Sequence, residues 1–203
     1  ACTPALGLSV MPAVVHAFAL KHPDVHVRLQ TIGTPQLREG LLHGQFDLAL
    51  STMVMRHPQL DATTLHRSNA VCVMHPGHPL AARKSLHVRD LQGQVLLTLH
   101  ADDEIYLQLQ DTMQQHGITA ASTIETTYSS TICMLAAQGT GLGVVNPYVA
   151  SVFAQQLHIV PLLPRCPVEV VLAFPPQSAL SAMAEPFVAL LQAHFKAPEE
   201  AAG

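Results

Sequence analysis

The sequence is poor in charge and in aromatic side chains. Charged residues make up 12% of the 203 positions and aromatic residues 4%, with no Trp, whereas apolar residues make up 49%. A disordered chain has the opposite balance, so this composition predicts a compact fold. The apolar runs, such as residues 170–174, reach only the length of a strand. A membrane helix needs roughly 18 or more apolar residues, so none is predicted.

Cations are scarce and scattered. The chain has 10 Lys and Arg against 14 Asp and Glu, and the densest basic cluster is Arg83-Lys84. A DNA-binding surface needs clustered cations to displace counterions from phosphates. We therefore expect that this chain does not bind DNA by itself.

The four cysteines are far apart in the sequence. They are Cys2, Cys72, Cys133 and Cys166, and no two form a CxxC motif. Cys72 and Cys133 sit in apolar stretches, where Cys commonly acts as a small core residue. We predict reduced, structural thiols. A redox sensor would need two neighbouring thiols, one of low pKa, which the local spacing does not support.

Signatures of catalysis and of metal binding are also lacking. The sequence has no GxSxG, HExxH or Walker-type loop. Residues 139–143 are glycine-rich, but they follow a predicted helix and enter a strand, the reverse of a dinucleotide loop. The 13 histidines occur singly, without a Cys or carboxylate at ligand spacing. No catalytic residue, metal or cofactor is predicted.

What the sequence does contain is a regular alternation of strands and helices. Residues 1–3 read as the end of a strand, 4–21 as a helix, and 25–31 as a strand with alternating apolar residues. A helix opening at Gly33-Thr34-Pro35 and a strand over 46–51 complete a βαβαβ unit. This order is typical of a parallel sheet covered by helices.

The alternation then repeats at low similarity. Further strands are predicted at 70–74, 95–99, 123–127, 143–145, 158–162 and 168–174, and helices at 88–91, 104–116, 130–138, 148–153 and 178–195. The fold class is α/β, with two Rossmann-like lobes joined by two crossovers. Lobe I should contain residues 1–69 and 159–203, and lobe II residues 70–158. Because open α/β sheets bind ligands at the carboxyl ends of their strands, a ligand site is expected in a cleft between the lobes.

Hydroxyl side chains stand at two strand-to-helix turns of the first lobe. Thr3 precedes Pro4-Ala5, and Thr34 stands between Gly33 and Pro35. Free N–H groups and the positive dipole end at a helix start suit an anion. The alternative is that both threonines simply cap their own helices, and the two roles are compatible.

In the second lobe, polar residues also follow predicted strands. His100 and Ala101 come after one strand, Thr127, Tyr128 and Ser129 after another, and Asn146 after the third. These positions are where a ligand in the cleft would meet that lobe.

Five motifs occur in the order and spacing of one family. They are residues 4–18 followed by His22-Pro23-Asp24-Val25, residues 41–50 (LLHGQFDLAL), 75–81 (HPGHPLA), 91–93 (LQG) and 136–145 (AAQGTGLGVV). Together they resemble the effector-binding domain of LysR-type transcription regulators over essentially the whole chain. The resemblance implies a periplasmic-binding-protein type II-like fold and a small-molecule sensor, not an enzyme, in the cytoplasm.

The resemblance also implies partners and site residues. The domain would form a homodimer that sets the helix at 6–21 against the partner's helix at 130–138, and the full-length protein a tetramer. DNA would be bound only through an N-terminal winged helix-turn-helix domain that lies outside this sequence. The effector-binding residues carried over are Thr3, Pro4, Ala5, Thr34, Ser51, His100, Ala101, Thr127, Tyr128, Ser129 and Asn146.

One departure from the family pattern points to a ligand class. Asn146-Pro147 and residues 167–170 resemble the branch that includes regulators of lysine synthesis and opine catabolism. An amino acid or derivative is therefore the expected effector, with Asp102, Asp103 or Glu125 facing its ammonium group. The rival reading is a periplasmic solute-binding protein, which shares the two lobes. It should carry a secretory leader and act as a monomer. The HPGHPLA turn and the dimer-type first helix at residues 6–21 favour the regulator.

Overall fold

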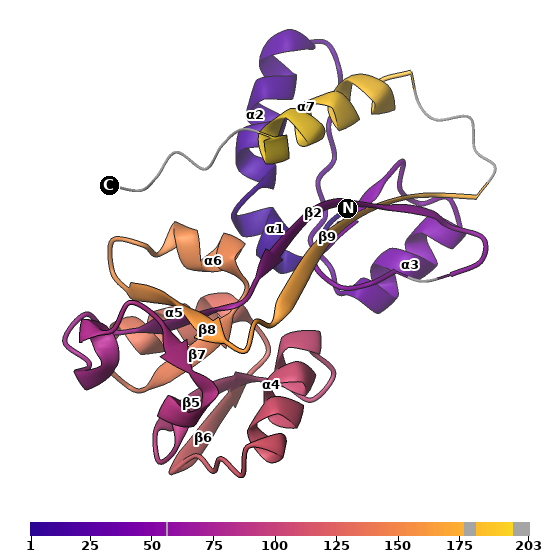
Figure 1. The fold of residues 1–203 in the computed structure, drawn as a ribbon. Coiled ribbons are helices and arrows are strands. Elements are labelled where there is room, and N and C mark those ends of the chain that lie inside the picture. Colours follow the sequence, from indigo (N-terminus) through magenta and orange to yellow (C-terminus); the bar gives the residue numbers. More distant parts are fainter. Residues whose placement is uncertain (56, 177–181, 197–203) are drawn as a thin grey trace. The chain divides into compact units, whose positions relative to one another are not determined.

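The computed structural model describes residues 1–55, 57–176 and 182–196. The chain divides into two compact units (Figure 1): unit 1 comprises residues 1–67 and 169–203, and unit 2 residues 68–168. The chain enters unit 2 within one long strand and leaves it within another. Two crossovers therefore connect the units, as predicted for this fold class.

Unit 1 is built on a three-stranded sheet of order β1-β9-β2. Its elements are α1 (Pro4–Leu8), α2 (Met11–Lys21), α3 (Thr34–Leu42), β1 (Ala49–Ser51), β2 (Asp61–Asn69), β9 (Pro167–Phe174) and α7 (Ala184–Lys196). Strand β1 runs antiparallel to β9, with Leu50 opposite Leu172. Helices α2 and α7 pack side by side (Figure 1), and the rings of Phe18 and Phe187 meet edge to face.

Two predictions for unit 1 are corrected by the structure, and one strand was not predicted. The single helix expected over residues 4–21 is split into α1 and α2, because Pro12 has no N–H to continue the α1 ladder. The strand expected at 25–31 forms only one bridge, between Thr31 and Cys2. Strand β2 was not predicted, since its sequence DATTLHRSN has little of the apolar alternation that marks a half-buried strand. Of the predicted final helix, residues 178–181 lie outside the described residues.

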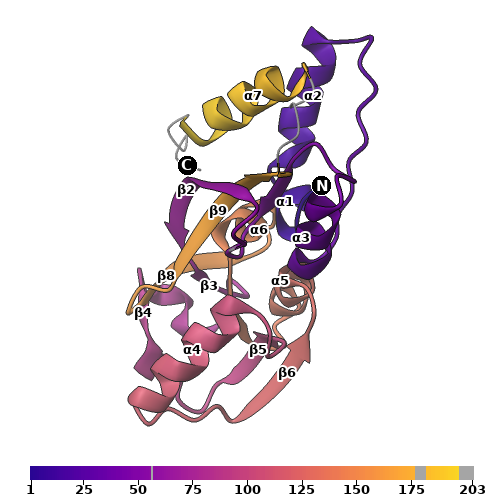
Figure 2. The same ribbon diagram turned by 90° about the vertical axis from the view of Figure 1, so that its right-hand side faces the viewer.

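Unit 2 contains a six-stranded sheet of order β4-β8-β3-β7-β5-β6. Its elements are β3 (Val71–Met74), η1 (Pro79–Ala82), β4 (Leu86–His87), η2 (Val88–Leu91), β5 (Val95–Leu99), α4 (Glu104–Gln115), β6 (Ser122–Thr126), α5 (Ser129–Ala137), β7 (Leu142–Val145), α6 (Pro147–Val152) and β8 (His158–Leu163). Strand β5 runs parallel to both of its neighbours. Helices α4 and α5 pack against β5 and β7 (Figure 2).

Strand β8 was expected in the first lobe, but it belongs to unit 2. It pairs antiparallel with β3, placing Val160 opposite Cys72, and parallel with β4. Because Val160 and Leu162 are buried in this sheet, the chain returns to unit 1 at Glu169 and not at residue 159.

No helix in the described part of the chain is long and apolar enough to cross a membrane.

Candidate functional site

Two hydroxyl side chains of unit 1 are hydrogen-bonded to each other at the carboxyl end of β1. The Oγ atoms of Thr34 and Ser51 lie 3.1 Å apart, and the backbone N–H of Met53 donates to Ser51 Oγ at 3.0 Å. Ser51 is completely buried and Thr34 is half-buried. Thr34 had been considered as the cap of α3. It is instead the first residue of that helix, and Gly33 occupies the N-cap position. The hydroxyl of Thr34 is therefore not used to cap its helix.

The Thr3 side chain is buried without a hydrogen-bond partner. Thr3 occupies the N-cap position of α1, but its side chain makes no capping bond. Only 6% of the residue is exposed, and among the described residues Oγ1 has no partner. The alternative that Thr3 serves mainly as a cap is therefore wrong. Burying a hydroxyl without a partner typically costs about 1–3 kcal/mol, so the fold keeps this group at a cost.

The backbone places Thr3 between the segments that carry the other two hydroxyls. Cys2 forms parallel bridges to Thr31 on one side and to Leu50 on the other, and the Thr3 N–H donates to the Leu50 carbonyl. Thr34 follows Thr31 closely in the sequence, and Ser51 comes directly after Leu50. The three hydroxyls thus belong to one corner of unit 1, at the start of α1, where Pro4 and Ala5 are half-buried.

The polar residues expected in unit 2 gather at one edge of its sheet. Strands β7, β5 and β6 are parallel neighbours, so their carboxyl ends lie at the same edge. His100 and Ala101 follow β5, Thr127 and Tyr128 follow β6, and Asn146 follows β7. The structure therefore brings these predicted positions together within unit 2.

Several of these side chains already have local roles. His100 Nδ1 accepts the Asp102 N–H at 3.1 Å, and Asn146 Oδ1 accepts the Val149 N–H at 2.9 Å. Asn146 is buried, and its side-chain oxygen caps α6. Tyr128 and Thr127 are exposed and Ser129 is buried in the first turn of α5.

Of the three carboxylates expected near an ammonium group, Asp103 is already used by the fold. It caps α4 by accepting the N–H groups of Ile105 and Tyr106. Burial raises the pKa of Asp103, while these two hydrogen bonds act in the opposite direction. The Asp102 side chain is 93% exposed and lies 3.8 Å from His100 Nδ1. Glu125 is exposed on β6.

All four cysteines are free and buried. Burial raises the pKa of Cys2 and Cys166 to about 11 and that of Cys72 and Cys133 to about 12. Such thiols hold little of the reactive thiolate at neutral pH, in keeping with the structural role predicted for them.

Among the described residues, no three His, Cys, Asp or Glu side chains are grouped so that they could hold a metal ion.

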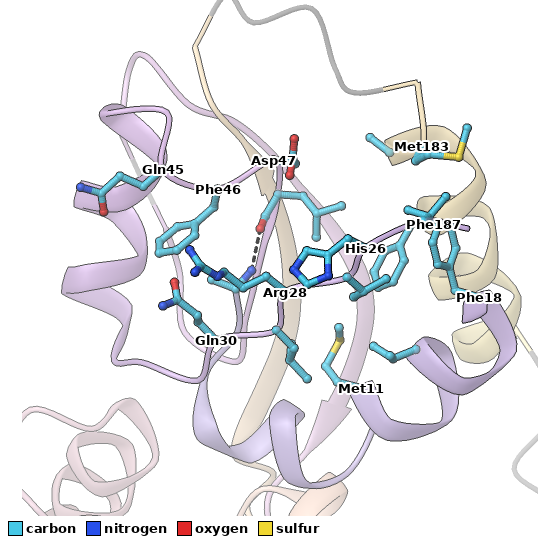
Figure 3. Close-up of a pocket in the computed structure, with 17 residues that line it drawn as sticks. Met11, Phe18, His26, Arg28, Gln30, Gln45, Phe46, Asp47, Met183 and Phe187 are labelled. Atoms are coloured by element: carbon cyan, nitrogen blue, oxygen red, sulfur yellow. Dashed lines mark hydrogen bonds between the residues drawn. The ribbon is translucent and has the colours of Figure 1, made fainter. Parts of the chain in front are cut away.

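A groove in unit 1 was not predicted from the sequence. It has a volume of about 490 Å³ and is lined by Ala1, residues 25–30 and 45–48, and side chains of α2 and α7 (Figure 3). Sequence reasoning missed it because it assigned residues 25–31 to a fully paired strand. The alternation of Val25 and Val27 with polar residues predicted that strand. Such an alternation does not show whether the strand is paired with its neighbours.

Comparison with known proteins defines the family. The family described as LysR substrate binding domain matches residues 1–196. The chain belongs to this family. Among curated relatives, the regulatory protein NocR of Agrobacterium tumefaciens (strain T37) is 29% identical over 154 residues, covering 76% of this chain and 51% of the relative. The transcriptional activator protein LysR of Escherichia coli (strain K12) is 30% identical, covering 76% and 50%. The chain thus spans about half the length of these curated relatives.

Solved structures show the same fold. The BenM effector binding domain with its effector benzoate matches with a TM-score of 0.78 at 21% identity, covering 98% of this chain and 93% of that one. The regulatory domain of Synechocystis PCC6803 CcmR, in complex with 2-PG, matches with a TM-score of 0.82 at 18% identity, covering 97% and 95%. The predicted family and the periplasmic-binding-protein type II-like α/β fold are confirmed. The chain is the effector-binding domain of a LysR-type regulator.

Proposed function

We propose that this domain binds a small anionic effector at the Thr3, Thr34 and Ser51 hydroxyls and thereby modulates DNA binding and transcription by its regulator. The observation that carries the proposal is the buried Thr3 hydroxyl without a partner. Ser51 Oγ accepts the Met53 N–H, so if Thr34 donates to Ser51, the Ser51 hydroxyl proton remains free. Thr3 and Ser51 would then offer two O–H donors to a carboxylate oxygen. This is a binding role, and we propose no enzymatic activity.

The residues at the sheet edge of unit 2 are proposed as further effector-binding residues. This set comprises His100, Ala101, Thr127, Tyr128, Ser129 and Asn146, of which Ser129 and Asn146 are buried. Pro4 and Ala5 complete the set in unit 1. Support comes from the gathering of each set within its own unit, at the carboxyl ends of parallel segments, where α/β sheets bind ligands.

An amino acid or a derivative is the proposed effector class. The Asn146-Pro147 sequence supports this class. Since Asp103 caps α4, the ammonium group would be met by Asp102 or Glu125, both of which are exposed.

We further propose a homodimer through this domain, a tetramer of the full-length regulator, DNA contact only through a separate N-terminal domain, and a cytoplasmic location. Exposed apolar side chains on the expected contact helices support the dimer: Leu8 ends α1, Leu20 is 72% exposed on α2, and Met134 is 60% exposed on α5. Such side chains are better accommodated against a partner than in water.

A thermal-shift screen of amino acids, opine-like conjugates and small carboxylates tests the effector class. A ligand at about 100 times its Kd stabilises the native state by about 2.7 kcal/mol. The Kd of each hit is then measured for the Thr127→Val and Asp102→Asn variants. The proposal is supported if Thr127→Val binds every hit more weakly and if Asp102→Asn binds only the amine-bearing hits more weakly. Hits confined to uncharged compounds, with unchanged Kd in both variants, would contradict it.

A further inference from the structure

We propose that one edge of the unit 2 sheet, around β4, is an interaction surface for a short acidic polypeptide segment that also carries a large apolar side chain. This surface, the basic edge, comprises Arg83, Lys84, Arg89, Leu163 and Arg165, all of which are exposed. The inference uses none of the effector-binding residues and does not depend on the effector proposed above.

The fold gathers every Lys and Arg of unit 2 at this edge. All residues of unit 2 are described, and four of them are Lys or Arg. Two stand just before β4, and Arg89 follows β4 in η2. Arg165 is distant in the sequence but comes soon after β8, which runs parallel to β4 and places Leu163 opposite His87. Cations that are scattered in the sequence are thus collected around one pair of strands.

Ion pairing within unit 2 leaves most of this charge free. Asp90 Oδ1 lies 2.9 Å from Arg83 Nη1, and the Asp90 carboxylate also takes part in the capping box of η2. The Arg83 side chain nevertheless remains 55% exposed. Lys84, Arg89 and Arg165 form no ion pair within the described chain. Four cations and one carboxylate therefore give the basic edge a net charge of +3.

The other end of the same sheet is acidic. The strand order places β4 at one end and β6 at the other, and Figure 2 shows these two strands on opposite sides of unit 2. The remaining carboxylates of unit 2 lie on β6, on α4 or in the turn before α4. They are Asp102, Asp103, Glu104, Asp111 and Glu125. The positive charge of unit 2 is therefore confined to the basic edge.

This distribution of charge favours a short acidic segment over nucleic acid. A DNA duplex carries roughly one negative charge per 1.7 Å of its axis and extends well beyond a patch of four cations. It would approach the carboxylates of α4 and β6, which outnumber those cations and would repel it. A short segment can instead neutralise the three unpaired cations and remain at the edge, so that opposite charges meet without this repulsion.

Leu163 gives the basic edge an apolar component. Its side chain is 41% exposed on β8. Interfaces between proteins commonly combine an apolar centre with a polar rim. A Leu in the bound segment would cover Leu163, while carboxylates on either side of that Leu would meet the cations of the edge. Arg89 and Arg165 can each bind a carboxylate through two N–H groups. The expected sequence is therefore acidic residues interrupted by Leu.

A titration followed by ¹⁵N NMR tests the proposal with the capped peptide Glu-Asp-Leu-Asp-Glu-Leu at low salt. The amides of Lys84, Arg89 and Arg165 should shift, whereas that of Ile124, on β6 at the other end of the sheet, should not. The uncharged peptide Gln-Asn-Leu-Asn-Gln-Leu should bind at least about tenfold more weakly, and added salt should weaken the acidic peptide. Glu-Asp-Ser-Asp-Glu-Ser should also bind more weakly, because it lacks the apolar contact.

Matched variants separate the basic edge from the overall charge of the chain. Arg89→Gln and Arg38→Gln each remove one exposed Arg, the second from α3 in unit 1. Arg89→Gln should raise the Kd of the acidic peptide by about threefold, and Lys84→Gln combined with it by about tenfold, whereas Arg38→Gln should leave the Kd unchanged.

Four outcomes would overturn all or part of this inference. Unshifted amides at the basic edge with millimolar acidic peptide would exclude the surface. An equal rise in Kd for Arg38→Gln would show that only the net charge matters. Equal binding of the Ser-containing peptide would remove the apolar contact. A short DNA duplex that binds more tightly than the peptide, and is weakened by Arg89→Gln, would replace the acidic segment by nucleic acid.

Discussion

Thr34 and Ser51, 17 residues apart in the sequence, share a hydrogen bond of 3.1 Å between their hydroxyl oxygens. This bond joins the start of α3 to the end of β1. Because the Met53 N–H also donates to Ser51, the Ser51 hydroxyl both supports the backbone and holds Thr34 in place. Thr3 lies in the same corner and takes no part in this support. The three hydroxyls should therefore respond differently to substitution.

Ser51→Ala should destabilise the domain. It removes a buried acceptor and leaves the Met53 N–H without its bond, for which a loss of about 1–3 kcal/mol is expected. Urea unfolding measures this change. Ser68→Ala, a half-buried position at the start of unit 2, serves as the control. A Ser51→Ala variant as stable as the wild type would show that the bond contributes nothing to folding.

Gly141 should tolerate no side chain. A Cβ at this position would lie 2.5 Å from the backbone oxygen of Val95, which cannot move without disturbing β5. Gly141→Ala should lower the free energy of unfolding by about 1–3 kcal/mol, as overpacking does. The neighbouring exposed Thr140→Ala is the control. Equal thermal midpoints for the two variants would refute the close approach.

The domain should lose stability as the pH is lowered, because His78 becomes protonated. Its Nδ1 accepts the Leu80 N–H at the start of η1, and burial lowers the pKa of His78 from its ordinary value of 6.5. The folded state thus binds this proton less readily than the unfolded state. The contribution to stability is complete above pH 6.5 and is lost as the pH falls below that value.

His78→Asn provides the matched variant for this prediction. An Asn side chain can accept the same N–H through its oxygen but does not titrate. Between pH 7.5 and 5.5, urea unfolding of His78→Asn should show a smaller loss of stability than the wild type. Parallel pH profiles would exclude a contribution from His78.

The thiols should be unreactive in the native state. Because burial raises the pKa of all four, an aromatic disulfide reagent at pH 8 should label them only as fast as the domain unfolds. Labelling in rising urea should follow the unfolding transition. A thiol that reacts at once without denaturant would identify an accessible cysteine, contrary to the structure.

Strands and helices with strong local signals were predictable from the sequence. Strand β5 has the predicted bounds, Val95–Leu99, because it is apolar and has clear turns on both sides. The glycine-rich stretch at 139–143 ends a helix and opens a tight turn as predicted, with Gly139 in the left-handed region at a φ of 78°. These features are determined by residues that are adjacent in the sequence, so they can be predicted from the sequence.

Features set by tertiary pairing were less predictable. The sequence of β8 is equally suited to either unit, and only its partner, β3, decides where it belongs. Strand β2 has few apolar residues to mark it. At the site, the positions of Thr3, Thr34 and Ser51 followed from the strand ends and from the family resemblance. That Ser51 supports Thr34 while Thr3 has no partner depends on three-dimensional contacts that no sequence pattern encodes.

The central claim, that the Thr3 hydroxyl is kept for an effector, is tested most directly by Thr3→Val, with unfolding and effector binding measured on the same preparation. Thr63→Val, at an exposed position of β2, is the control. Because Val fills the same volume without a buried, unpaired hydroxyl, Thr3→Val should be as stable as the wild type or more stable. Its affinity for the effector found by the screen should fall by about tenfold or more, which corresponds to about 1.4 kcal/mol. A Thr3→Val variant that is clearly less stable than the wild type, yet binds the effector with unchanged Kd, would contradict the account.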